Sequence, residues 1–334
     1  MKCRKCGEKA AVNLRQYRLA LCKAHFLEWL PEQAARAIHT YRMFTAEERV
    51  LMAVSGGKDS LTLWDVLIRL GYQADGLYIN LGIGKAEGDS SNSTPDSTNG
   101  AAGYSALSLE KIRQFMATRP DLKLHIVDVA ATYGAGIAEA ARLTARGRGK
   151  PCSVCGLTKR HIMNRVALEG GYDVLTTGHN LDDEAAVLMS NTLSWQVGYL
   201  ARQGPVLPAS GDGLIRKAKP FCRVYERDTA AYAILAGIDY IYDECPYAVG
   251  ATSIEYKELL NQLECKRRGG KLQFYIEFLR AKKEGLFAEQ GERVALTACT
   301  TCGQPSSAPG ECAFCRMWRQ VRERKQQGVE TTTA

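Results

Sequence analysis

Long apolar runs are missing from this sequence. No segment approaches the roughly 20 consecutive apolar residues that a membrane-spanning helix requires. The first ten residues, MKCRKCGEKA, contain no apolar stretch of the kind found in a secretory signal. Both absences argue against a membrane or secreted protein, so we expect a cytoplasmic one that does not bind a membrane.

A strong charge imbalance is also missing. The 334 residues contain 44 Lys and Arg against 36 Asp and Glu, which leaves a net charge of +8. A moderate positive charge is compatible with an ordinary soluble surface and with a polyanionic partner such as RNA, and alone it decides nothing. With 46% hydrophobic and 24% charged residues, the chain can form a full α/β core with small additional modules.

Cysteine, in contrast, is abundant, with 12 residues. In a long chain without a signal peptide, CxxC pairs more often bind metal or perform redox chemistry than form structural disulfides. Two sets, CxxC-x15-CxxH and CxxC-x9-CxxC, have the spacing of closed tetrahedral zinc sites, with redox thiols or chance spacing as alternatives. The two sets are Cys3, Cys6, Cys22 and His25 near one end, and Cys299, Cys302, Cys312 and Cys315 near the other.

Between these sets, strand-like and helix-like segments alternate. This alternation predicts an α/β fold with a doubly wound parallel sheet, flanked by the two zinc modules. The strand-like runs are 49–54, 74–80, 122–129 and 172–178, followed later by a helix at 226–236, a strand-like run at 238–244 and helices through Glu284. The expected units are a zinc finger (1–30), the α/β domain (31–250) with a mobile insertion (87–103), a helical extension (251–295), a second zinc finger with a basic helix (296–325) and a tail (326–334).

The segment LMAVSGGKDSLTLW places Ser55–Ser60 between a buried strand and an amphipathic helix. Free backbone N–H groups at such a junction bind phosphate, and two glycines permit a close approach. A Walker A loop would need glycine at Met52 and would not place Asp59 after the lysine. We expect Lys58 to neutralise phosphate charge and Asp59 to bind magnesium. The structural alternative is a simple strand-to-helix turn.

A second motif, TTGHNLDDEA, follows the fourth strand-like run at 176–185. It places Gly178, His179 and two aspartates at the carboxyl end of the predicted sheet, where open α/β sheets bind ligands. Asp182 and Asp183 are suitable magnesium ligands, although capping of a helix N-terminus is an alternative role for one of them.

Together, SGGKDS and GHNLDD resemble the PP-loop and its partner motif in the N-type ATP pyrophosphatase superfamily, which has a HUP-like fold and cleaves ATP between the α and β phosphates. The wider combination of two zinc modules with PCSVCG and DECPYAVGATS resembles the TtuA/TtcA group of tRNA thiolation enzymes, and most closely its TtuA-type tRNA 2-thiouridine synthetases. This resemblance covers nearly the whole chain, except 87–103 and the tail after about Lys325.

The resemblance implies a [4Fe–4S] cluster held by three cysteines, with its fourth iron open. Cys152 and Cys155 match the family's CxxC, and Cys245 matches its third position, with Cys222 and then Cys265 as alternatives. A third zinc site or a redox disulfide is the other interpretation of the CxxC.

The implied reaction is ATP-dependent tRNA 2-thiolation by a sulfurtransferase. ATP adenylates the C2 oxygen of a uridine, with 5-methyluridine at position 54 of the T loop as the expected target, and sulfur delivered through the cluster replaces that oxygen, releasing AMP and pyrophosphate. The residues expected to act in catalysis are Lys58, Asp59, Asp183, Cys152, Cys155 and Cys245. Those expected to bind ATP are Ala53, Ser55, Gly56, Gly57, Lys58, Ser60, Ile79, Lys159, Gly178 and His179, and the Mg²⁺ ligands are Asp59, Asp182 and Asp183.

The implied partners are tRNA, a ubiquitin-like sulfur carrier with a C-terminal thiocarboxylate, and a second copy of the chain in a homodimer. We expect tRNA to contact the zinc modules and the basic segments 264–271 and 316–325. In the second segment, Arg316, Arg319 and Trp318 suit phosphate contact and base stacking, with a solvated basic helix as the alternative.

Three other functions remain open from the sequence. The target could be a different base, such as the wobble uridine or a cytidine, because the motifs specify activation chemistry rather than the base. The enzyme could activate a base without sulfur, as in lysidine synthesis. A non-catalytic zinc and RNA-binding protein with a structural ATP site is the third alternative.

Overall fold

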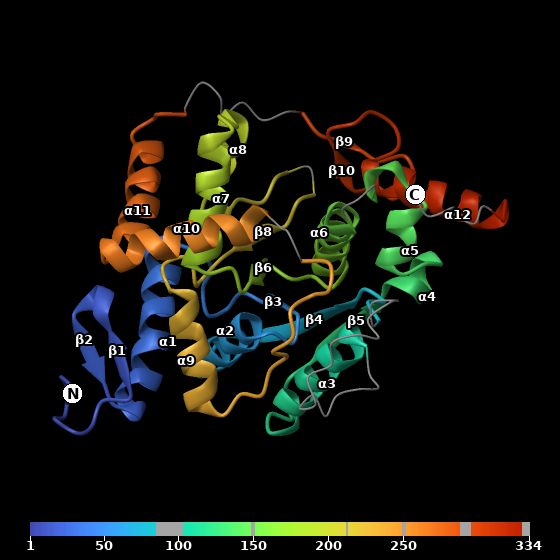
Figure 1. The fold of residues 1–334 in the computed structure, drawn as a ribbon. Coiled ribbons are helices and arrows are strands. Elements are labelled where there is room, and N and C mark those ends of the chain that lie inside the picture. Colours follow the sequence, from blue (N-terminus) through green and yellow to red (C-terminus); the bar gives the residue numbers. More distant parts are fainter. Residues whose placement is uncertain (85–102, 148–150, 212, 249–251, 288–294, 329–334) are drawn as a thin grey trace, which may run out of the picture.

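The computed structural model describes residues 1–84, 103–147, 151–211, 213–248, 252–287 and 295–328 (Figure 1). Most of the insertion expected at 87–103 lies outside the described residues. Among the described residues, no helix has the length and the apolar character needed to cross a membrane.

The largest sheet in the described part has the strand order β5-β4-β3-β6-β8-β7. Neighbouring strands are parallel except for the antiparallel edge pair β7 and β8. This order confirms the predicted doubly wound sheet, because the chain runs outward from β3 through β4 and β5 and then returns to the other side of β3 with β6. The strands are β3 (Val50–Val54), β4 (Ala74–Asn80), β5 (Leu124–Asp128), β6 (Val174–Thr177), β7 (Val206–Leu207) and β8 (Arg216–Ala218).

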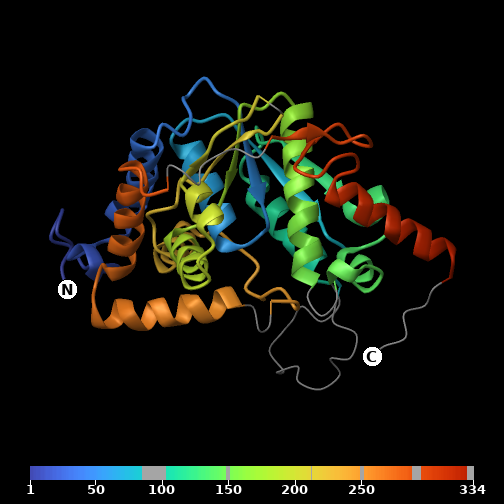
Figure 2. The ribbon, with the colours of Figure 1, turned by 90° about the horizontal axis from the view of Figure 1, so that it is seen from above.

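Helices cover both faces of this sheet (Figures 1 and 2). Alternate side chains of β3 face opposite ways, so Val50 and Met52 belong to one apolar core and Leu51 to the other. The first core contains side chains of α1 (Lys23–Thr40), α2 (Lys58–Arg69), α3 (Tyr104–Ala117) and α9 (Glu226–Ala236). The second contains side chains of α4 (Val129–Tyr133), α5 (Ile137–Arg142), α6 (Pro151–Glu169) and α12 (Ala313–Gln326), near the 3-10 turn η2 (Ala145–Gly147).

The helical extension packs beside the sheet, where Leu260 meets Ala185 and Ala186 in a third, small core. The extension consists of α10 (Thr252–Lys266) and α11 (Gly270–Lys283). It packs against α7 (Leu181–Leu193), which is followed by α8 (Val197–Arg202). The helices predicted at 226–236 and through Glu284 are therefore present.

The strand predicted at 238–244 is wrong. The segment is irregular, and its backbone bonds to a loop: the Ile241 N–H donates to the Gly56 carbonyl at 2.9 Å. Ile238, Tyr240 and Ile241 are buried, so the apolar pattern reflects packing of a loop segment rather than pairing in a sheet.

Each end of the chain forms a small cysteine module. The N-terminal hairpin consists of β1 (Val12–Leu14), the 3-10 turn η1 (Arg15–Tyr17) and β2 (Leu19–Leu21), and leads directly into α1. The expected boundary at residue 30 falls inside α1. The C-terminal module pairs β9 (Thr297–Ala298) with β10 (Pro305–Ser306) and continues into α12.

Candidate functional site

The two phosphate-related motifs meet at the point where the strand order reverses. β3 and β6 are neighbours, with Ala53 opposite Thr177, so the segments that follow them leave the same edge of the sheet. Ligands of open α/β sheets bind at this kind of edge. The structure therefore brings Ser55–Ser60 and the Gly178–Asp183 segment together, as the sequence predicts.

The loop Ser55–Ser60, called the PP-loop below, is held by its own hydroxyl groups. The Ser55 N–H donates to Ser60 Oγ at 3.1 Å, and Ser60 Oγ donates to the Gly57 carbonyl at 3.0 Å. Gly56 has φ +77°, and a Cβ there would lie 2.6 Å from the Ser108 carbonyl oxygen. α2 begins at Lys58, so its first-turn amides, which no helical carbonyl can accept, face the loop. These free amides make the loop suitable for binding an anion.

Gly178 is required by close packing between the two motifs. A Cβ on Gly178 would lie 2.9 Å from backbone atoms of Asp59 and Ser60. His179 next to it is exposed, and its ring Nδ1 lies 2.7 Å from Thr177 Oγ1. The carboxyl end of β6 thus lies directly against the first turn of α2.

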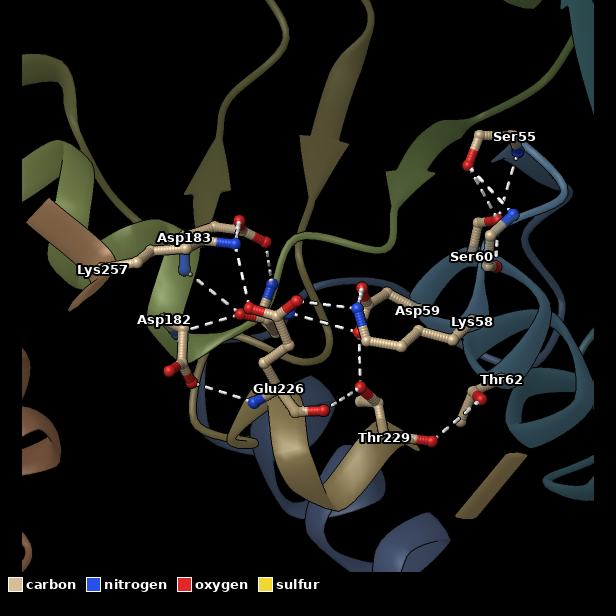
Figure 3. A network of polar contacts seen from close by, with 12 residues as sticks. Ser55, Lys58, Asp59, Ser60, Thr62, Asp182, Asp183, Glu226, Thr229 and Lys257 are labelled. Carbon is tan, nitrogen blue, oxygen red and sulfur yellow. Dashed lines mark hydrogen bonds and ion pairs between the residues drawn. The ribbon is translucent and has the colours of Figure 1, made fainter. Parts of the chain in front are cut away.

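Three carboxylates and two lysines form a charged network over this edge (Figure 3). Lys58 Nζ lies 3.1 Å from Asp59 Oδ2 and 2.7 Å from Glu226 Oε1. Lys257 Nζ, from α10, lies 2.6 Å from Asp183 Oδ1 and 3.0 Å from Glu226 Oε2. Glu226 therefore links the PP-loop lysine to the lysine of the helical extension.

The charge states follow from this pairing. Burial would raise the pKa of Glu226, but Lys257 and Lys58 outweigh it and lower that pKa to about 2. Burial would lower the pKa of Lys58, but Asp59 and Glu226 outweigh it and raise that pKa. Burial raises the pKa of Asp59, although Lys58 and the Thr229 hydroxyl oppose this effect. The network holds Glu226 and Lys58 charged at neutral pH.

The two aspartates of GHNLDD have different environments. Asp182 is buried and forms an ion pair with the buried Lys271, and its other oxygen accepts the Glu226 N–H at 2.9 Å. Asp183 completes a capping box with Asn180 and keeps one oxygen on Lys257. The helix-capping role considered for one of the pair therefore belongs to Asp183, whereas both oxygens of Asp182 are engaged by Lys271 and the Glu226 N–H. Because Asp183 Oδ1 faces Lys257 in the charged network that includes Asp59, Asp183 and Asp59 stay the candidates for magnesium.

Three further residues of the network, Glu226, Thr229 and Lys257, belong to no motif in the sequence. Thr229 Oγ1 donates to Asp59 Oδ1, and Asn180 Nδ2 donates to the same oxygen at 3.2 Å. Glu226 begins α9 and Lys257 lies within α10, and neither stands in a spacing pattern that signals a site. Only the packing of α9 against α2 and of α10 against α7 identifies them.

The central cysteines lie at the start of α6, next to the irregular segment that follows α9. Cys152 is exposed, and its Sγ donates to the Tyr247 carbonyl at 3.4 Å. Burial raises the pKa of the half-buried Cys155, Lys159 opposes that rise, and the thiols of Cys245 and Cys152 reinforce it. Cys245 thus lies near the CxxC and the predicted nucleotide residue Lys159.

The alternatives to Cys245 have different surroundings. Cys222 is fully buried in the first core, whereas Val154 and Cys155 belong to the second core on the opposite face of the sheet. Cys265 is exposed near the end of α10.

The segment 241–247 contacts both the PP-loop and the CxxC. At one end, the Ile241 N–H binds the Gly56 carbonyl of the PP-loop at 2.9 Å. At the other, the Tyr247 carbonyl accepts from Cys152. Cys245 lies between these contacts, so one short segment touches both the phosphate loop and the CxxC.

The terminal cysteine sets are gathered more tightly than the central one. Each brings its four ligand atoms within 4.8 Å of one another, and in the described residues no other set of three or more potential ligands does so. The geometry suits a single tetrahedral ion. Three thiols around a four-iron cubane stand farther apart, because the cluster itself fills the space between them.

The remaining predicted residues have mixed outcomes. Ala53 and Ile79 lie on the neighbouring strands β3 and β4, as adenine contacts would require. Trp318 does not stack on an external base: it is 1% exposed and stacks on Tyr133, with ring centroids 5.0 Å apart. The basic residues of α12 are exposed, as the alternative of a solvated basic helix expects, while the apolar face of this helix belongs to the second core.

The doubly wound sheet with SGGKDS after β3 and GHNLDD after β6 defines a PP-loop ATP pyrophosphatase fold. The chain is 49% identical over 324 residues to a tRNA-5-methyluridine(54) 2-sulfurtransferase of Thermus thermophilus, covering 97% of this chain and 93% of that protein. A protein of the same name from Thermotoga maritima is 42% identical over 97% of this chain and 98% of its own length. The chain belongs to the tRNA-5-methyluridine(54) 2-sulfurtransferase family.

Two further comparisons agree with this assignment. Residues 2–27 match the model of the N-terminal LIM domain of the 2-thiouridine synthetase TtuA. The solved structure of the U34-tRNA thiolase NcsA from Methanococcus maripaludis with its [4Fe-4S] cluster is similar over 94% of this chain and 95% of that one, at 25% identity and a TM-score of 0.72.

Proposed function

We propose that this chain uses ATP to replace the C2 oxygen of 5-methyluridine 54 in tRNA with sulfur. Family membership supports the reaction class. The observation that carries the proposal is the segment 241–247, which contacts the PP-loop through Ile241 and the CxxC through Tyr247. Activation of a base and delivery of sulfur must occur at one place, and this segment joins the two candidate sites.

ATP would bind with its phosphates on the PP-loop amides and Lys58. Phosphate oxygens would compete with Glu226 for the Lys58 ammonium, and Mg²⁺ would bind Asp59 and Asp183, whose carboxylates project over the same edge (Figure 3). The uridine C2 oxygen would attack the α-phosphorus and the bond to the pyrophosphate would break, while Lys58 and the loop amides would stabilise the charge that develops, to which a bound Mg²⁺ would add its own positive charge. Ala53, Ile79 and Lys159 complete the nucleotide site, and His179 lies at its exposed rim.

The donor set at the start of α6 fits an iron–sulfur cluster. Cys152, Cys155 and Cys245 offer thiols only, at exposed or half-buried positions, and Cys222 lies in the other core. A [4Fe–4S] cluster held by three thiolates supplies one iron that can bind a sulfur atom. The chain's own residues would hold it beside Lys159 and within reach of the nucleotide edge. The terminal sets would each hold a structural zinc ion.

Three further parts of the proposal concern partners and location. Sulfur would arrive on a ubiquitin-like carrier with a C-terminal thiocarboxylate, and the chain would act as a homodimer. A cytoplasmic location is supported by the name of a relative from Drosophila grimshawi, cytoplasmic tRNA 2-thiolation protein 1, which is 29% identical over 91% of this chain.

The test is anaerobic incubation of purified protein with unmodified tRNA, ATP and a sulfide source, followed by mass spectrometry of the nucleosides. We expect one 2-thiolated 5-methyluridine at position 54, AMP and pyrophosphate, and about four irons per chain. Cys152→Ala should abolish thiolation, and Cys265→Ala should leave it intact. Thiolation only at position 34 would overturn the proposed target, and a protein without iron would overturn the cluster.

A further inference from the structure

Positive charge is concentrated in the N-terminal module. Residues 1–30 contain seven Lys and Arg and two Glu, a net +5 within a chain whose total is +8. A zinc ion on three thiolates and a neutral imidazole would subtract only one charge. More than half of the excess positive charge of the protein therefore belongs to less than a tenth of its length.

These cations surround a hollow of about 840 Å³. No acidic residue lines it, and in the described part of the chain no lining cation is in an ion pair with a carboxylate. The lining cations are Lys2, Arg4, Arg15, Arg18 and Arg268. Charge repulsion among five uncompensated cations is a cost that an anionic ligand would relieve.

In the basic helix α12, in contrast, several cations bind groups of the same chain. Arg319 pairs with Glu311 at 3.2 Å and with Glu323 at 2.9 Å, and Lys325 pairs with Glu139 at 2.8 Å. Arg324 donates to the Leu143 carbonyl at 2.8 Å. Several of the cations of this helix therefore fasten it to its own chain, whereas those around the hollow are free to bind a ligand.

We propose that this hollow binds the phosphodiester backbone of the tRNA substrate, an inference that rests on the proposed function. Four of its five cations are arginines, whose planar guanidinium groups match phosphate oxygens in pairs. The hollow combines residues of the N-terminal module with Arg268, so a ligand seated there bridges two parts of the protein that are far apart in sequence. An extended polyanion fits this arrangement, and contacts to phosphates fix its position without reading its sequence.

The turn that carries Arg268 is tied to the ATP site. Glu264, four residues earlier, accepts from the Tyr225 hydroxyl at 3.4 Å and from the Lys271 N–H at 2.9 Å. Lys271 in turn forms the buried ion pair with Asp182 at the start of α7. Figures 1 and 2 both show this corner of α10 and α11 beside the N-terminal hairpin. A tRNA held at the hollow is thereby held at a fixed position relative to the PP-loop.

The test is steady-state thiolation with the full-length protein carrying Arg4→Ala, Arg15→Ala and Arg268→Ala together. We expect KM for tRNA to rise at least about tenfold, kcat at saturating tRNA to stay unchanged, and the slope of log affinity against log salt to fall by about two to three. The same three positions changed to Lys should retain the salt slope. The matched control is Arg113→Ala, an exposed arginine on α3, which should change none of these values.

The outcomes separate the inference from the proposed function. If the wild type thiolates tRNA and the triple Ala variant keeps its KM and salt slope, the hollow is not a tRNA site. If the triple variant binds tRNA normally but needs more sulfur-carrier protein, the hollow binds an acidic protein instead, which also overturns the inference. Failure of the wild type to thiolate any tRNA would count against the proposed function. Metal content and thermal unfolding establish folding, and the single variant Arg15→Ala gives a smaller shift in the same direction if the triple variant is unstable.

Discussion

The terminal and central cysteines of this chain differ in the groups that shift their thiol pKa values and in the segments that bring them together. Burial would raise the pKa of Cys3 and Cys299, but backbone N–H groups around each sulfur outweigh it and lower the pKa to about 6. In the same sets the pKa values of Cys6, Cys302 and Cys315 are raised, so one thiol of each set carries the lowered value. Cys155 has no backbone N–H donor among the groups that shift its pKa, and burial raises that pKa. Local turns thus build the terminal sites, whereas the central site is assembled from α6 and a distant irregular segment. Closed sites of this kind stabilise structure, and the central site is left accessible for chemistry.

The strongest test of this difference is Cys245→Ala. Removal of one thiol from the central set should lower thiolation at least about a thousandfold, or about 4 kcal/mol in the activation barrier. The free energy of unfolding should change by less than about 1 kcal/mol, because Cys245 is only half-buried. Activity is measured by nucleoside mass spectrometry and stability by denaturant titration.

Cys222→Ala is the matched control. It removes a fully buried sulfur from the first core, so it should cost stability and leave thiolation intact. Loss of thiolation in Cys222→Ala with retention in Cys245→Ala would reverse the assignment of the third thiol.

In the C-terminal module, Trp318→Ala should lower stability by about 3 kcal/mol. This value lies at the lower end for a buried tryptophan because its Nε1 has no hydrogen-bond partner among the described residues and loses none. The control Trp195→Ala concerns a side chain that is 75% exposed, and it should stay within about 0.5 kcal/mol of the wild type. Equal effects of the two changes, measured by chemical denaturation, would show that α12 does not depend on this contact.

Lys257→Ala tests whether activity depends on the charged network beside the PP-loop. It leaves Asp183 and Glu226 without their shared cation, and we expect kcat/KM for ATP to fall about tenfold, which corresponds to about 1.4 kcal/mol. Lys257→Arg should recover part of the loss. Metal at the terminal sets, measured by elemental analysis, should be unaffected by either change, and its loss would mean that the two regions are not independent.

The smallest expected effect is a pH dependence at the contact between α6 and the C-terminal module. Burial lowers the pKa of His161 from 6.5 to about 4, and its ring stacks on Phe314 with centroids 3.6 Å apart. Because the folded-state pKa is depressed, its contribution is fully present above pH 6.5 and is lost as the pH falls from about 6.5 toward 4. At pH 5 we expect a loss of about 1 kcal/mol after solvent screening. His161→Gln should remove this part of the pH dependence of thermal unfolding, and an unchanged profile would contradict it.

Local patterns predicted much of the fold and part of the site. The strands at 49–54 and 74–80 are correct, and the residues of both terminal sets are gathered as predicted, because their spacing reflects contacts made by nearby residues. The strand at 238–244 failed because alternating apolar residues pack equally well in an irregular segment. The buried role of Trp318 was present in the sequence: Phe314, Met317, Trp318 and Val321 have the spacing of one helix face.

The charged network at the catalytic edge could not be predicted in the same way. Glu226 contacts Lys58 of the PP-loop from 168 residues later in the chain, and Lys257 joins the network through Asp183 and Glu226. No spacing rule relates such positions, because their meeting depends on how α9 and α10 pack against the end of the sheet. The separate roles of Asp182 and Asp183 likewise became visible only through Lys271 and Lys257.

The segment between Ile241 and Cys245 also limits the distance between Cys245 and the PP-loop. Its first residue is fixed to the PP-loop by a backbone hydrogen bond, and four peptide units cannot extend beyond about 14 Å. Whatever loop movements accompany tRNA entry, the Cα of Cys245 cannot move farther than this from Ile241 while that bond holds. Insertion of residues between Ile241 and Cys245 would lengthen this connection while leaving every motif intact. We expect such a variant to separate base activation from sulfur delivery in one protein.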